Sequence, residues 1–222
     1  MYKYPVTEKF VSINGEGRKA GELSCFVRFA GCNLSCDYCD TRWSCTPDAP
    51  HEDLTAEEIP AWVRSTGVRN VTLTGGEPLL QPEPETLFRA LREIGNARIE
   101  VETNGSVLLD PAVHFQPEVF YTMDMKCPGS RMVEHNRYEN LSVLRPVDVV
   151  KFVVSDRADL DWTREILRKY QLIGRCLVYI SSVFGRIRPS EIVDYLKEYE
   201  MNDVRLQLQL HKYIWDPTLR GV

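Results

Sequence analysis

The sequence lacks the features that place a protein in or across a membrane. No apolar run approaches the roughly 20 residues that a membrane-spanning helix needs. The first residues, Met1-Tyr2-Lys3-Tyr4-Pro5, do not form the long apolar segment of a signal peptide. The cysteines number seven, and an odd number without a secretory signal disfavours a set of disulfides. We therefore expect a soluble, cytoplasmic protein with reduced cysteines.

Concentrated positive charge is also missing. Lys and Arg number 27 against 32 Asp and Glu, the net charge is −5, and the basic residues are spread along the chain. Because neutralising phosphates needs a concentrated basic surface, direct nucleic-acid binding is not expected. The chain has 222 residues, of which 43% are hydrophobic, and no linker-like stretch interrupts it. This size and composition predict a single globular domain over residues 1–222.

What the sequence does contain is three cysteines, Cys32, Cys36 and Cys39, in a CxxxCxxC spacing on a loop rich in Gly, Asn, Asp and Ser. A structural zinc site usually needs a second CxxC-type pair or an HxxxH partner, and neither is present. A buried apolar segment is the common place for a free cysteine, but this polar loop does not fit one. Cysteine thiolates hold iron–sulfur clusters. Three of them would leave one iron of a 4Fe–4S cluster with an open coordination position, which is where metal chemistry takes place.

Strand and helix patterns alternate along the chain. The predicted strands are 24–29, 70–74, 98–103, 119–125, 147–154, 176–182 and 204–210, and the predicted helices are 55–66, 83–94, 159–170 and 190–199. Residues 4–13 alternate only loosely, residues 41–53 are predicted to be a surface loop, and the continuous apolar run 147–154 is typical of a parallel strand covered on both faces. Strands that alternate with helices predict a mainly parallel sheet. Because a closed barrel needs eight strands, we predict an α/β fold of the partial (β/α) barrel type.

Chemically useful residues follow four of the predicted strands. The cysteine loop follows the first strand, Gly75-Gly76-Glu77 follows the second, and Asn104 and Lys126 follow the next two. In parallel sheets the chemistry collects at the carboxyl ends of the strands. The glycines allow close backbone approach to a ligand, and Glu77 can accept hydrogen bonds from an ammonium group. The sequence therefore predicts that these residues share one site.

Two of these motifs together resemble a known superfamily. CxxxCxxC with Tyr38 before its last cysteine, followed by Thr74-Gly75-Gly76-Glu77-Pro78, is similar to the signature of the radical S-adenosylmethionine (SAM) enzymes. In that superfamily SAM binds the open iron through its amino and carboxylate groups, and one electron from the cluster yields a 5′-deoxyadenosyl radical. The resemblance implies a 4Fe–4S cluster, SAM and an electron donor such as flavodoxin or ferredoxin.

Further motifs resemble one branch of the superfamily, the 7-carboxy-7-deazaguanine synthases of queuosine and deazapurine biosynthesis. They lie at 14–17, 28–33, 39–41, 74–78, 102–105 and 209–212, from one end of the chain to the other. The resemblance implies a lyase that converts 6-carboxy-5,6,7,8-tetrahydropterin, a small pterin substrate, to 7-carboxy-7-deazaguanine with loss of ammonia. It also implies Mg²⁺ as a further cofactor and allows a homodimer.

The resemblance also assigns roles to residues. It gives the cluster to Cys32, Cys36 and Cys39, and Mg²⁺ to Thr41. The SAM positions are Tyr38, Asp40, Gly76, Glu77, Lys126, Ser181, Ser182, Val183 and Phe184. The substrate positions are Ile13, Asn14, Gly15, Glu16, Arg28, Thr74 and His211. The chain departs from the branch in two places, because Asn14 stands where the branch has Gln, and Asp124-Met125 stands where it has Ser-Pro.

The residues themselves leave alternatives open. Arg28 suits a solvated strand edge as well as an anion clamp, residues 14–17 suit a hairpin turn, and Lys126 and His211 are of types that are usually solvated or internally satisfied. Cys25 and Cys176 are predicted to be structural thiols, whereas the sequence does not decide the roles of Cys45 and Cys127.

Two other activities also stay open. A glycyl-radical activating enzyme has a similar size and cysteine spacing. A non-catalytic iron–sulfur electron carrier would hold a cluster without binding SAM. Neither the physiological reductant nor the downstream deazapurine can be read from the chain.

Overall fold

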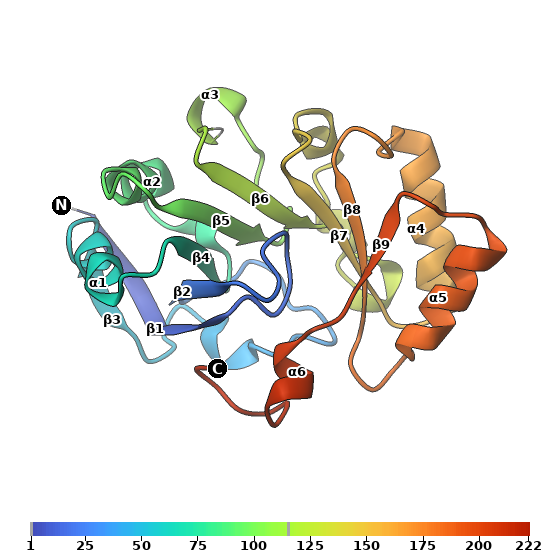
Figure 1. Ribbon diagram of the computed structural model, residues 1–222, viewed down its shortest axis with the longest axis horizontal. Coiled ribbons are helices and arrows are strands. Elements are labelled where there is room, and N and C mark those ends of the chain that lie inside the picture. The colour runs from blue at the N-terminus through green and yellow to red at the C-terminus, as the bar shows by residue number, and fades with distance from the viewer. Residues whose placement is uncertain (1, 115) are drawn as a thin grey trace.

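Nine strands form one sheet in the computed structural model, which describes residues 2–114 and 116–222. Their spatial order is β3-β1-β2-β4-β5-β6-β7-β8-β9, and they fan out across the molecule in Figure 1. The strands are β1 Lys3–Ile13, β2 Leu23–Phe29, β3 Glu52–Thr55, β4 Asn70–Gly75, β5 Arg98–Thr103, β6 Val119–Asp124, β7 Val149–Val154, β8 Leu177–Ser182 and β9 Val204–Gln207. The order does not close, because β3 and β9 remain the two edges.

All seven predicted strands are present, and together they make the parallel part of the sheet, from β2 through β4 to β9. β1 and β3 extend it with antiparallel pairing. The prediction of a loop over 41–53 is wrong at its end, because β3 begins at Glu52 and pairs with β1 from Lys3 to Val6. A four-residue edge strand that contains two acids has too little alternation to show in the sequence. The predicted partial barrel is confirmed.

Helices occupy the connections that lead to the parallel strands, and one more helix follows the last strand. They are α1 Glu58–Thr66, α2 Pro84–Arg92, α3 Pro111–His114, α4 Arg157–Tyr170, α5 Pro189–Glu198 and α6 His211–Ile214. Short 3₁₀ helices are η1 Arg42–Ser44, η2 Pro78–Leu80, η3 Pro128–Ser130, η4 Val133–His135 and η5 Tyr138–Ser142. The hydroxyl of Thr55 accepts the Glu58 N–H at 3.2 Å, and the Glu58 carboxylate accepts the Thr55 N–H at 2.8 Å, a capping box at the start of α1. No helix of the described residues is long and apolar enough to cross a membrane.

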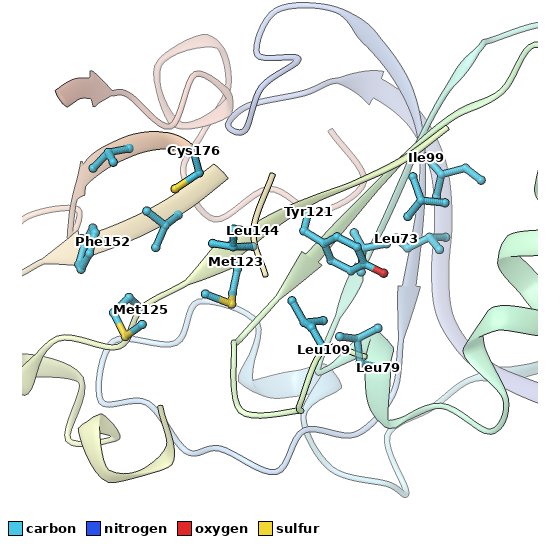
Figure 2. Close-up of a cluster of buried hydrophobic side chains, with 14 of the residues drawn as sticks. Leu73, Leu79, Ile99, Leu109, Tyr121, Met123, Met125, Leu144, Phe152 and Cys176 are labelled. Atoms are coloured by element: carbon cyan, nitrogen blue, oxygen red, sulfur yellow. The ribbon is translucent and has the colours of Figure 1, made fainter. Parts of the chain in front are cut away.

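The two faces of the sheet differ sharply in chemistry. Alternate residues of the central strands, such as Val101, Met123 and Phe152, belong to one buried apolar cluster, part of which Figure 2 shows. The residues between them point the other way because side chains alternate along a strand. Several of these are polar or charged and yet buried: Thr72, Thr74, Glu100, Thr122, Lys151 and Ser181. Hence the apolar face forms the core, and we call the opposite face the polar face.

Candidate active site

A cavity of about 560 Å³ lies at the polar face and the carboxyl ends of the strands. Its wall combines the cysteine loop, the turn after β1, the ends of the central strands and residues 217–222. Most of the predicted site residues line it: Ile13, Gly15, Glu16, Arg28, Cys32, Cys36, Tyr38, Cys39, Asp40, Thr41, Thr74, Gly76, Lys126, Ser182, Val183, Phe184 and His211. Asn14, Glu77 and Ser181 lie outside the described wall. The structure thus gathers residues from both ends of the chain around one space.

The cysteine loop is fastened to three separate parts of the fold. Arg42 donates to the carbonyl oxygens of Cys36 and Asp37, at 3.1 and 2.7 Å. The hydroxyl of Tyr38 donates to the Val153 carbonyl on β7 at 3.1 Å. The Asp37 carboxylate is paired with Arg186 at 2.7 Å. These contacts hold the loop over the sheet.

The sulfur atoms of the loop are in surroundings that suit thiolates. Cys32 Sγ accepts the Leu34 N–H at 3.4 Å and an N–H of the Asn104 amide at 3.5 Å. The neighbouring Cys45 thiol, whose sulfur lies 3.8 Å from Cys39 Sγ, is the main influence that lowers the pKa of both Cys32 and Cys39 to about 6, against the opposing effect of burial. Thiolates are the form that binds iron.

The same three cysteines can be tested against the cluster that their spacing predicts. Among the described residues, no three or more His, Cys, Asp or Glu side chains form a site for a metal ion. A four-iron cluster is a larger body than one ion and needs thiolates that are spread around a space, and Cys32, Cys36 and Cys39 all face the same cavity. The N–H donors at Cys32 Sγ fit a cluster ligand, since hydrogen bonds to the sulfurs are a normal feature of such sites. The residues therefore fit a 4Fe–4S cluster.

The loop after β4 packs directly on the start of the cysteine loop. A Cβ atom at Gly76 would collide with the Gly31 carbonyl oxygen, and the Glu77 N–H donates to that same oxygen at 2.8 Å. The Glu77 carboxylate accepts hydrogen bonds from the Thr103 hydroxyl at 2.8 Å and from the Asn104 N–H at 2.6 Å. Only glycine fits at position 76, and Glu77 ties this loop to the end of β5. A direct contact of Glu77 with SAM stays a prediction.

The turn after β1 is completed by the other end of the chain. The Gly15 carbonyl accepts the Leu210 N–H at 2.9 Å, and a Cβ atom at Gly15 would collide with the His211 ring. The Gln207 amide exchanges two hydrogen bonds of 2.9 Å with the backbone of Gly17. Burial is the largest influence that lowers the pKa of His211, which favours a neutral imidazole. This turn is therefore part of the cavity wall and not a free hairpin.

Asn14 itself is turned away from the cavity. It is 2% exposed, its amide oxygen accepts the Thr72 hydroxyl at 2.7 Å, and its amide nitrogen lies 3.5 Å from the Glu100 carboxylate. Glu100 also accepts the Thr122 hydroxyl at 2.6 Å. The Asn14 side chain therefore ties the turn after β1 to β4 and β5. Any substrate contact through this side chain remains a prediction.

Two ion pairs, Arg28 with Glu8 and Lys212 with Asp40, lie at the rim of the cavity. Arg28 donates its Nε–H to Glu8 at 2.7 Å, and this is the hydrogen bond that its guanidinium makes among the described residues. The Asp40 carboxylate is paired with Lys212 at 2.8 Å, which joins α6 to the cysteine loop (Figure 1). Val27 and Phe29 face the core, so Arg28 has the opposite orientation that the strand alternation predicts.

Three charged residues on the cavity wall, one buried and two partly buried, were not among the predicted site residues. Glu102, Asp124 and Lys151 come from β5, β6 and β7. Lys151 could have been noticed in the sequence, because it is a charged residue in the middle of an apolar strand. The predicted parallel strand, covered on both faces, is present as β7, but one of its faces carries Lys151, which lines the cavity. Asp124 Oδ1 is buried without a hydrogen bond, although the Lys151 ammonium lies 3.3 Å away.

Comparisons with known proteins agree with these observations. The family model of the radical SAM superfamily matches residues 26–119. A 7-carboxy-7-deazaguanine synthase of Clostridium acetobutylicum is 49% identical over 219 residues, which is 99% of each chain. The chain belongs to the 7-carboxy-7-deazaguanine synthase family. A synthase of Chlorobaculum tepidum is 36% identical and covers 98% of this chain and 96% of its own.

The fold of this family member also matches a solved structure. The crystal structure of QueE from Escherichia coli superposes with a TM-score of 0.73 at 20% identity and covers 93% of both chains. Membership of the radical SAM superfamily implies SAM and a 4Fe–4S cluster as cofactors. The family match does not favour the alternative of a glycyl-radical activating enzyme.

Proposed function

We propose that this chain is a single-domain radical SAM lyase that converts 6-carboxy-5,6,7,8-tetrahydropterin to 7-carboxy-7-deazaguanine with loss of ammonia. The observation that carries the proposal is the one cavity wall shared by the cluster cysteines, the turn after β1 and the tail after β9. An electron carrier needs a cluster near its surface, but it has no use for a large cavity beside it. A SAM-dependent enzyme needs that space for a cofactor and a substrate.

In this proposal the chain binds, orients and shields. When bound, the cluster and SAM would supply radical hydrogen abstraction, which is chemistry that the protein itself cannot provide. Cys32, Cys36 and Cys39 would hold the cluster. Gly76 would let the backbone approach SAM closely, and Lys126, paired with Asp124 at 2.6 Å, would present a fixed positive charge to it.

The substrate end of the cavity has the group that a carboxylate requires. Arg28 offers its terminal nitrogens while Glu8 holds Nε, and such a fork matches a carboxylate with two parallel charge-assisted hydrogen bonds. Gly15, Glu16, Thr74 and His211 would contact the rest of the pterin. The guanidinium is therefore positioned by the protein and does not have to be ordered by the substrate.

Magnesium belongs to the proposal through Thr41. Its hydroxyl lines the cavity beside Cys39, 3.7 Å from Sγ, and a hydroxyl is a hard-oxygen ligand of the kind that Mg²⁺ accepts beside waters and substrate oxygens. Turnover should rise with added Mg²⁺, and Thr41→Val should weaken that response and raise the KM for the substrate. Full activity of Thr41→Val with an unchanged Mg²⁺ response would remove Thr41 as a ligand.

The deciding experiment is an anaerobic assay of reconstituted protein with the carboxytetrahydropterin, SAM, Mg²⁺ and a reductant. We expect 7-carboxy-7-deazaguanine to form by mass spectrometry while SAM is used catalytically. Bound iron with no SAM binding would identify an electron carrier. SAM cleavage without this product in the presence of substrate would instead favour an activating enzyme.

The reaction needs a donor of electrons to the cluster, and the proposal extends to this donor, the compartment and the oligomeric state. We propose that the enzyme works in the cytoplasm with flavodoxin or ferredoxin as its electron donor, and that two copies form a homodimer. Reduction of the cluster by each purified carrier, followed optically, would test the donor, and sedimentation would test the dimer.

A further inference from the structure

Lys151 is a buried cation that none of the roles above uses. It lies in the middle of β7, only 7% exposed, between neighbours that are apolar. Removing an ammonium from water is costly unless carboxylates compensate for the lost hydration. A lysine on the polar face of a central strand therefore needs a specific set of partners.

Those partners come from different parts of the site. The Lys151 ammonium lies 3.3 Å from Asp124 Oδ1 on β6 and 3.6 Å from Glu16 Oε2 in the turn after β1. Burial alone would lower the pKa of Lys151, but Asp124, Glu16 and Glu102 raise it well above its usual range. Lys151 is therefore a fixed positive charge and not a proton donor.

The two carboxylates depend on Lys151 to different degrees. Asp124 has a second and closer cation, because Lys126 lies 2.6 Å from Oδ2. Among the described residues, Glu16 forms an ion pair with Lys151 and with no other cation. Its other contacts are neutral donors, the Ser181 hydroxyl at 3.1 Å and the Gln209 amide at 3.3 Å. Loss of Lys151 thus leaves Asp124 paired and Glu16 without its countercharge.

Glu16 also has limited capacity left. A carboxylate offers about four lone-pair sites, and three donors from β7, β8 and the segment after β9 already approach it. Such a cradle fixes the direction of the group, so that its remaining acceptor position can face an N–H of a ligand in the cavity.

We propose that Lys151 is a positioning residue that orients the Glu16 carboxylate toward an N–H donor of the pterin. Binding of SAM does not depend on Lys151. This inference rests on the proposed function, because it deepens the substrate role of Glu16. Lys151 should therefore affect the affinity for the substrate and leave the affinity for SAM unchanged. A residue needed only for folding would affect both affinities together.

The test compares two binding constants on the same anaerobic, cluster-loaded samples. The probes are 6-carboxypterin, followed by its own fluorescence, and SAM, followed by equilibrium dialysis. The variants are Lys151→Met, Lys151→Arg and the exposed control Lys197→Met, whose side chain on α5 pairs only with Asp194 among the described residues. Iron content and the thermal unfolding midpoint are measured for each.

We expect Lys151→Met to weaken 6-carboxypterin binding by at least about tenfold and SAM binding by less than about threefold, with iron content retained. Lys151→Arg should recover much of the pterin affinity, and Lys197→Met should match the wild type. Equal pterin affinity in wild type and Lys151→Met, or equal losses for both ligands, would overturn the positioning role. A wild type that binds SAM but not the pterin would instead overturn the proposed substrate, and the role of Lys151 with it.

Discussion

Lys151 and Phe152 are neighbours on β7, yet they serve opposite faces of the sheet. Phe152 is fully buried against the helices, and its ring lies 6.3 Å from that of Trp162 on α4. Lys151 is almost as buried, but its contacts are carboxylates at the cavity. Burial alone therefore does not say which residues hold the fold and which hold the ligands. The chemistry of the neighbours does.

The largest effect should come from a residue of the cavity. Cys36→Ala should prevent reconstitution of the cluster, which wild type holds with about four iron atoms per chain, and should abolish turnover, because two thiolates cannot secure it. Iron analysis and absorption spectra measure this. Cys176→Ala, a thiol of the apolar face, is the control and should keep its iron. One bound zinc per chain in wild type, with no iron, would contradict the cluster itself.

A change on the core face should act on stability. Phe152→Ala should lower the free energy of unfolding by about 3–5 kcal/mol, because it removes a fully buried ring and leaves a cavity. Urea titration measures the loss. Below the unfolding transition, the KM for the substrate should stay within about threefold of wild type. A large rise in KM with little loss of stability would show that the two faces are not separate.

Arg28→Lys changes a residue of the polar face and should affect catalysis more than stability. Lysine cannot reproduce the two parallel hydrogen bonds of the guanidinium, so kcat/KM should fall by roughly a hundredfold. Cluster content and SAM binding should be intact, and SAM cleavage should continue without product. The control is Arg205→Lys, an exposed position on β9. Near-normal kcat/KM would return Arg28 to the role of a solvated edge residue.

A further effect should be a dependence of stability on pH that belongs to Glu100. Burial, with Glu102 nearby, raises its pKa from an ordinary value of 4.5 to about 8, against the opposing effects of Thr122, the Arg18 backbone and Lys151. A carboxyl with a raised folded pKa contributes most below its unfolded pKa, and that contribution is lost as the pH rises towards the folded value. Unfolding free energy should therefore decline between about pH 5 and 8.

The isosteric variant isolates this contribution. Glu100→Gln cannot ionise, so its urea midpoint should decline less over the same pH range than that of wild type. Glu165→Gln, an exposed position on α4, should follow wild type. Parallel curves for wild type and Glu100→Gln would show that Glu100 does not carry the effect.

The core face could be predicted from the sequence, and the polar face only in part. Apolar alternation located the parallel strands, and motif spacing located the loops at their carboxyl ends. Asn14 shows why the rest was hidden: its partners Thr72 and Glu100 are 58 and 86 residues away, and only strand register brings them together. Lys151 was overlooked for the same reason, because a charge within an apolar run acquires meaning only from the strands beside it.

The contact between Gly17 and Gln207 has a consequence for synthesis of the protein. These residues are 190 positions apart, and Gln207 clamps both the N–H and the carbonyl of Gly17. A ribosome makes the turn and the cysteine loop long before it makes Gln207, while N-terminal parts of a chain begin to fold first. Until Gln207 is made, the nascent chain thus carries its cysteines without a complete cavity wall around them. Cluster insertion should follow synthesis of Gln207, and chains truncated before Gln207 should lack a formed substrate turn.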